Sequence, residues 1–181
     1  MRKIPAIFSL LLFTVCFFQA CEVENCPPNA LSFAHFSLVN QYGQPVSTAV
    51  PTSVYGLMKA DVTVKDTLPD GTLQDRVVHD SIIRDTLINK EANLKSFKVP
   101  LSFSNETQFI LDYNGQGQDI ITVQHKNIPY FMNIDCGTMM FHQVTGVTNS
   151  RGIDSIQIIN PNIDNYEKEN FKIYFTVADS E

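Results

Sequence analysis

Hydrophobic and polar residues alternate with a period of two in several segments of this chain. The alternation is strict from Phe97 to Phe103 and returns at Phe109, Leu111 and Tyr113. This period is typical of β-strands with one buried face. Other strand-like stretches lie at residues 31–39, 53–65, 76–88, 119–126, 139–148, 156–158 and 171–177. The pattern therefore predicts eight or nine short strands.

Turn sequences separate these stretches. The turns are Asn40–Pro45, Leu68–Gly71, Asn114–Gly117 and Asn160–Asn162. The mature chain has no convincing amphipathic helix, and we expect at most a helical turn near residues 165–168. Many short strands with frequent turns favour an all-β fold, a single antiparallel β-sandwich that is immunoglobulin-like or similar. We expect this one domain to span residues 30–181.

The N-terminus has the pattern of an export signal. Arg2 and Lys3 precede an uncharged apolar run over residues 4–18, and Ala20 stands directly before Cys21. Such a run is short for a membrane span and suits a signal peptide. Ala20-Cys21 resembles a bacterial lipobox, in which the cysteine is lipidated after cleavage. We expect a lipoprotein signal peptide over residues 1–20 and a lipidated tether over residues 21–29; an ordinary secreted protein cut nearby is the alternative.

The charge argues against nucleic acid as a partner. The 181 residues carry a formal net charge of −6, whereas nucleic-acid binding needs a basic face that replaces phosphate counterions. Beyond the first twenty residues no apolar segment is long enough to cross a bilayer. We expect contact with the membrane through the lipid on Cys21 alone.

Two cysteines remain if Cys16 leaves with the signal peptide and Cys21 carries lipid. In an oxidising envelope, Cys26 and Cys136 most simply form a disulfide with each other. The alternative is a pair of free thiols, with Cys136 as a reactive one.

Candidate catalytic and metal-binding chemistry is sparse. The densest stretch, residues 135–142, contains Cys136 and His142, which could form a thiol site or a metal site together with His125 or His35. The histidines lie far apart along the chain and match no zinc-binding spacing. We therefore expect no catalytic residue, no metal and no cofactor, with a thiol- or metal-dependent enzyme as the least favoured alternative.

A short tripeptide recurs more often than composition suggests. Aspartate, then serine or threonine, then an aliphatic residue occurs four times. The tripeptide resembles the O-glycosylation sequence of exported Bacteroidetes proteins. Strand-forming composition also enriches such tripeptides, because threonine and aliphatic residues both favour strands. The candidate O-glycosylation sites are Thr67, Ser81, Thr86 and Ser155.

Several segments together resemble an uncharacterised Bacteroidetes lipoprotein family. The segments are the lipobox, Cys26-Pro27, the block from Cys136 to His142, residues 158–162 and residues 169–175. The resemblance implies the localisation and the cysteine pair. It implies no activity, ligand or catalytic residue.

The sequence thus predicts a lipid-anchored, non-enzymatic lipoprotein of the cell envelope, at the outer membrane, that acts as a binding or accessory module. Its partner would be an envelope protein or a glycan. A sheet edge, or the loops around residues 40–52 and 66–76, would form the contact surface. The alternative is a structural component of an outer-membrane assembly.

Overall fold

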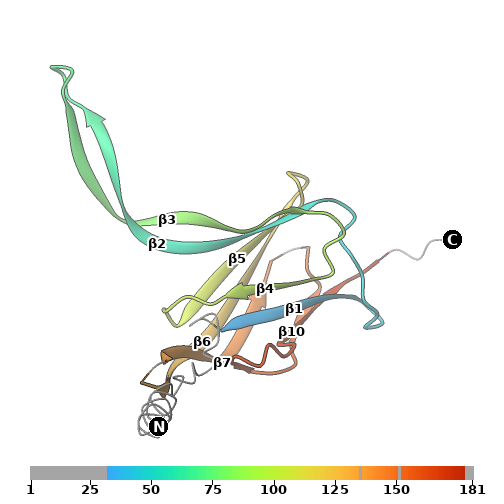
Figure 1. Ribbon diagram of the computed structural model, residues 1–181. Coiled ribbons are helices and arrows are strands. Elements are labelled where there is room, and N and C mark those ends of the chain that lie inside the picture. Colours follow the sequence, from blue (N-terminus) through green and yellow to red (C-terminus); the bar gives the residue numbers. More distant parts are fainter. Residues whose placement is uncertain (1–31, 135, 151, 178–181) are drawn as a thin grey trace, which may run out of the picture.

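The protein consists of two β-sheets in the computed structural model, which describes residues 32–134, 136–150 and 152–177 (Figure 1). This part of the chain contains no helix. The strands are β1 (Phe33–Asn40), β2 (Thr52–Thr67), β3 (Leu73–Glu91), β4 (Ser96–Pro100), β5 (Glu106–Asp112), β6 (Gln118–Asn133), β7 (Gly137–Asn149), β8 (Ser155–Ile158), β9 (Asn162–Ile163) and β10 (Phe171–Phe175). The all-β prediction is confirmed.

Hairpins join three neighbouring strand pairs, β2–β3, β5–β6 and β6–β7, and the other neighbours are not consecutive in the sequence. The six-stranded sheet has the order β3-β2-β5-β6-β7-β9, and the four-stranded sheet has the order β4-β1-β10-β8. We expected antiparallel pairing throughout, and this was wrong for one pair, because β1 and β10 run parallel with Phe36 opposite Phe171. These strands come from opposite ends of the described chain, so no local turn sequence could indicate their direction.

The hydrophobic core contains buried residues of both sheets. Phe36 of β1 stacks between Phe97 of β4 and Phe171 of β10, with ring centroids 4.8 and 4.4 Å apart. Its edge meets Phe109 of the other sheet at 6.0 Å. Ala34 and Leu38 are buried on the same face of β1. Each fully buried large side chain contributes about 1.5–3 kcal/mol to folding, and the phenylalanine cluster joins the sheets.

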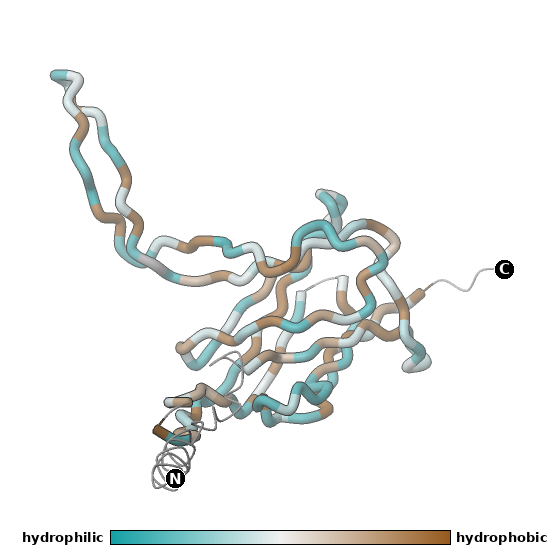
Figure 2. Tube along the Cα trace, in the orientation of Figure 1, coloured by the Kyte–Doolittle hydropathy of each residue, from teal (hydrophilic) through white to brown (hydrophobic). Residues whose placement is uncertain are grey.

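A long two-stranded arm extends from this body (Figure 1). β2 pairs with β5 only as far as Leu57, opposite Gln108, whereas β2 and β3 continue to pair as far as Thr67 and Leu73. We call residues 58–84 the arm. Hydrophobic and hydrophilic residues are interspersed along both of its strands (Figure 2). The predicted turn at residues 68–71 forms the arm tip, where Gly71 has a φ of 83°.

Of two further local predictions, a hairpin and a helical turn, one is confirmed and one is wrong. The hairpin at residues 114–117 is confirmed, with the Tyr113 amide donating to the Gly117 carbonyl at 3.0 Å. The helical turn expected near residues 165–168 was wrong; only a turn at residues 165–166 occurs there. In the described part of the chain, no helix has the length and hydrophobicity to cross a membrane.

Candidate binding groove at the base of the arm

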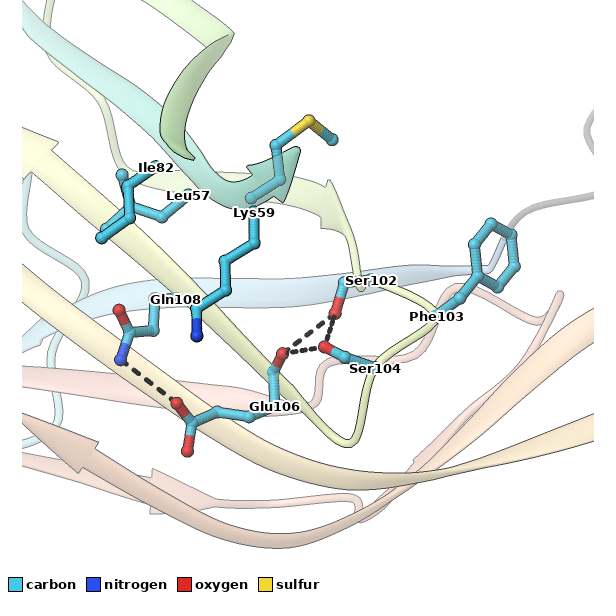
Figure 3. A pocket seen from close by; sticks show the side chains of 9 residues that line it. Leu57, Lys59, Ile82, Ser102, Phe103, Ser104, Glu106 and Gln108 are labelled. Atoms are coloured by element: carbon cyan, nitrogen blue, oxygen red, sulfur yellow. Dashed lines mark hydrogen bonds between the residues drawn. The ribbon is translucent and has the colours of Figure 1, made fainter. Parts of the chain in front are cut away.

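A groove of about 650 Å³ opens where the arm leaves the body (Figure 3). One wall is the base of the arm, and the other is the connection between β4 and β5 with the start of β5. We call it the arm-base groove. It is lined by Leu57, Met58, Lys59, Ile82, Ser102, Phe103, Ser104, Glu106 and Gln108. The fold thus brings together three segments that are at least twenty residues apart in the sequence, at residues 57–59, 82 and 102–108.

The lining combines apolar surface with a few charges. Leu57 and Ile82 lie side by side on the arm wall, and Lys59 extends into the groove beside Gln108 (Figure 3). Gln108 Nε2 donates to Glu106 Oε1 at 3.2 Å. Phe103 leaves 69% of its surface exposed. Apolar surface with a few oriented polar groups is the chemistry of a binding site.

Hydrogen bonds hold the loop that carries Phe103. The hydroxyl groups of Ser102 and Ser104 both donate to the Glu106 carbonyl. The Ser102 amide donates to Thr107 Oγ1 at 2.9 Å. The loop therefore presents Phe103 from a fixed backbone.

A buried pair of histidines lies beneath this loop. His125 of β6 and His142 of β7 meet edge to face, with ring centroids 4.9 Å apart. The Nδ1 atoms of His125 and His142 lie 3.0 and 2.8 Å from Asn127 Oδ1. Asn127 Nδ2 donates to the Phe103 and Ser104 carbonyls, which fixes the amide orientation. Each histidine must therefore donate its Nδ1 proton to the amide oxygen.

This arrangement also determines which atom carries the proton in the hydrogen bond between His125 and Thr107. With Nδ1 protonated, the neutral His125 ring accepts at Nε2, so Thr107 Oγ1 donates to it at 2.9 Å. Burial lowers the pKa of His125. Burial and the neighbouring His125 lower the pKa of His142 to about 4. Both rings are neutral at neutral pH, with Asn127 bonded to both Nδ1 atoms and Thr107 bonded to His125 Nε2.

The structure separates the residues of the predicted thiol or metal site. His142 faces His125, whereas His35 lies on β1 in the other sheet. Cys136 lies in the turn before β7, where its amide donates to Asn133 Oδ1 at 2.7 Å. Within residues 32–134, 136–150 and 152–177, no group of three or more His, Cys, Asp or Glu side chains could hold a metal ion.

The predicted N-terminal features lie outside the described residues. They are the signal peptide over residues 1–20, the tether over residues 21–29, the lipidated Cys21 and the disulfide partner Cys26. Lipidation and the bond between Cys26 and Cys136 therefore stay predictions.

Three of the four candidate O-glycosylation sites lie on the hairpin that forms the arm. Thr67 is exposed at the end of β2, and Thr86 is exposed on β3. Ser81 is half-buried, and its hydroxyl donates to the Val78 carbonyl at 3.3 Å. Ser155 is exposed on β8 in the other sheet. Modification at Thr67 would place a sugar near the arm tip, and modification at Thr86 would place one on the body side of the arm base.

A second groove, of about 410 Å³, contains part of the loop predicted for contact. Residues 46–50 line it together with Tyr113 and Asp119. Asp119 is buried and accepts hydrogen bonds from Tyr113, Ser150 and the Gly152 amide, at 3.0, 3.1 and 2.7 Å. Burial and Asp119 raise the pKa of Tyr113. This network anchors the loop before β8. It was not predicted, because no sequence spacing links its residues.

Comparison with known proteins gives one match. A family model described as a family of unknown function (DUF6452) matches residues 76–175, from β3 to the end of β10. No curated protein and no solved structure matches the chain. The matched segment, 100 residues (175 − 76 + 1), exceeds half of the 181 residues. The chain therefore belongs to the DUF6452 family of unknown function.

Proposed function

We propose that this protein is a lipid-anchored, non-enzymatic accessory module of a bacterial cell envelope, and that it binds an envelope protein through the arm-base groove. The observation that carries the proposal is the groove itself. It pairs exposed apolar surface on Phe103 and Ile82 with the charges of Lys59 and Glu106. A protein segment offers matching apolar and charged side chains.

The envelope location rests on the sequence. The charged start, the apolar run and Ala20-Cys21 support export and lipidation, and the resemblance to a Bacteroidetes lipoprotein family supports the same location. An acyl chain pair gives stable anchoring, whereas a single chain binds only marginally. We place the lipid on Cys21 at the outer membrane.

We further propose that the two sheets form one sandwich. The shared phenylalanine cluster supports this, because Phe36 and Phe109 meet across the sheets. Such a body is a rigid scaffold, and its arm and loops supply the contacts. Rigid scaffolds that carry binding loops are common among β-sandwiches.

A structural role in an outer-membrane assembly is the second candidate. The exposed apolar side chains of the arm, among them Leu73 and Val77, favour it, because exposed apolar surface marks contact sites. A structural component would remain in a stoichiometric complex during purification, whereas an accessory module would exchange with free protein.

Two measurements test the proposal. Mass analysis of protein from native membranes should show diacylglycerol on Cys21, and Cys21→Ala should release the protein from the membrane fraction. Groove variants Phe103→Ser and Lys59→Glu should reduce recovery of a co-purifying envelope protein at least about tenfold, because the first removes apolar surface and the second reverses a charge at the centre of the contact.

The matched control is Tyr166→Ser. Tyr166 is 74% exposed in the loop before β10, away from the groove. This variant should keep the partner. Equal recovery with all three variants would overturn the groove proposal, and a Cys21 without lipid would overturn the anchor.

A further inference from the structure

The outer edge of β3 has no strand partner among residues 32–134, 136–150 and 152–177. β3 is the first strand in the order of the six-stranded sheet, and within this part of the chain it pairs with β2 alone. An edge strand presents a row of N–H and C=O groups that can pair with another strand. β3 is nineteen residues long, which is far longer than a typical edge strand.

A β-bulge interrupts this strand near its middle. Ala60 lies opposite Ser81 and Val62 lies opposite Val78, so His79 and Asp80 together face Asp61. Asp61 holds the bulge through His79 Nδ1 at 2.9 Å and the Asp80 amide at 3.3 Å. Asp80 has a φ of 53°. Two residues of β3 therefore occupy one pleat position.

Because of the bulge, β3 residues at the same distance on either side of it point to the same face of the sheet. Val77 and Ile82 lie opposite Thr63 and Lys59, which share a face of β2 because they are an even number of residues apart. By the same rule, Asp75 and Arg84 also lie on that face. Counted outwards from the bulge, Val77 and Ile82 are each the second position, and Asp75 and Arg84 are each the fourth.

Along β3, this face therefore carries a negative side chain, an apolar side chain, the bulge, a second apolar side chain and a positive side chain. Val77 and Ile82 are 48% and 68% exposed, and Asp75 and Arg84 are exposed on either side of them. The pattern is complementary to itself when the strand direction is reversed. A two-fold axis through the bulge would set Asp75 of one copy opposite Arg84 of the other, twice.

We propose that β3 pairs antiparallel with β3 of a second copy of this chain, about a two-fold axis through the bulge. Val77 of each copy packs on Ile82 of the other, and Asp75 pairs with Arg84 at both ends of the contact. Directly opposed strand residues point to the same face with Cβ atoms about 5 Å apart. A register shifted by two residues breaks both ion pairs and both apolar contacts.

The inference goes beyond the proposed function, because strand pairing needs neither the lipid nor an envelope partner. It uses the outer edge of β3 and shares Ile82 with the arm-base groove, whereas Phe103 and Lys59, which the groove variants change, take no part in the strand pairing. If the pairing fails, the groove proposal still stands, and a failed groove experiment leaves the pairing intact.

Cysteine cross-linking tests the register directly. Full-chain Val77→Cys and Ile82→Cys proteins, differently tagged and purified in detergent, are mixed and oxidised. The mixture should give a cross-linked heterodimer. Neither variant should cross-link by itself, because equivalent positions would be four pleats apart, about 13 Å, which is too far for a disulfide.

The matched control mixes Thr63→Cys with Ile82→Cys. Thr63 lies directly opposite Val77 but on β2, away from the free edge. This mixture should give no heterodimer. No heterodimer from the Val77→Cys and Ile82→Cys mixture would overturn the proposal, as would equal yields from the control mixture.

A charge exchange tests the ion pairs. Arg84→Asp should weaken dimerisation, measured by sedimentation of the full chain, by about tenfold, because it sets two carboxylates opposite each other. The double variant D75R/R84D should restore dimerisation to within about threefold of the unsubstituted protein. A double variant as weak as Arg84→Asp would overturn the proposed pairs, with unchanged unfolding curves confirming that both variants are folded.

Discussion

The rings of His125 and His142 meet edge to face inside the six-stranded sheet, with centroids 4.9 Å apart. Both donate Nδ1–H to the amide oxygen of Asn127. The amide orientation fixes Nδ1 of both histidines as donors, and burial, which lowers both pKa values, keeps the rings neutral at neutral pH. Protonating either ring would place a cation beside its neighbour in a buried site, which is costly.

Stability should therefore fall in mild acid. The pKa of His142 is about 4 in the folded chain, below its ordinary value of 6.5. Between these two pH values the unfolded state binds more protons than the folded state, so the free energy of unfolding decreases as the pH falls. His142 alone accounts for about 3 kcal/mol of this decrease, measurable by denaturant unfolding at a series of pH values.

One variant identifies the source of this pH dependence. His142→Gln cannot titrate at position 142, so its free energy of unfolding should decrease less than that of the unsubstituted protein between pH 6.5 and 4. An unchanged profile in His142→Gln would contradict the assignment.

Gly152 approaches Asp119 too closely for any side chain. A Cβ on Gly152 would lie 2.4 Å from Asp119 Oδ2, and Asp119 is buried in its own hydrogen bonds. Gly152→Ala should cost about 2–4 kcal/mol of unfolding free energy. Gly117→Ala is the control, because its Cβ would meet nothing within 4 Å, and its cost should stay below about 1 kcal/mol. Equal costs would refute the close approach.

Substitutions of a core phenylalanine and of a groove phenylalanine should differ in their effect on the free energy of unfolding. Phe36 is fully buried between two stacked rings, whereas Phe103 is mostly exposed. Phe36→Ala should lower the unfolding free energy by about 3–5 kcal/mol, and Phe103→Ala should change it by less than about 0.5 kcal/mol. A large loss of stability in Phe103→Ala would mean that this side chain supports the fold and is no contact residue.

The arm should be dispensable for folding. Beyond Leu57 its strands pair with each other and with no further strand of the described residues. Replacing residues 60–81 by Asn-Gly, which favours a tight hairpin turn between Lys59 and Ile82, should change the thermal midpoint of the body by only a few degrees. The same variant should be monomeric in sedimentation. A body that unfolds without the arm would contradict this separation of roles.

Local alternation predicted most strands because each signal lies within its own segment. Phe97, Val99 and Leu101 are buried as the period of two requires. The prediction ran too far at Phe103, because the strand ends at Pro100 and the chain turns outward. Alternation alone cannot indicate where a strand loses its partner.

The extension of β6 beyond residue 126 was missed for a physical reason. Most of its side chains there are exposed, and Pro129 interrupts the pattern. Proline is tolerated because β5 pairs with β6 only as far as Gln124, so one side of this extension has no ladder partner in the part of the chain that the structure describes.

The candidate site was the least predictable feature. The arm-base groove joins residues of β2 and β3 to the loop before β5, and it depends on where pairing with β5 ends. His125 and His142 meet only because of the β6–β7 register, which shifts between Gln124 and His125. Local periodicity predicts neither the register between β6 and β7 nor the length of the arm.

Photo-cross-linking in living cells tests the central proposal most directly. A photoreactive amino acid replaces Lys59 in the groove, and in a matched protein it replaces Gln157, which is exposed on β8. We predict that one envelope protein is captured from position 59 and that position 157 gives no such product. Capture from both positions alike, or from neither, would contradict a binding function for the groove.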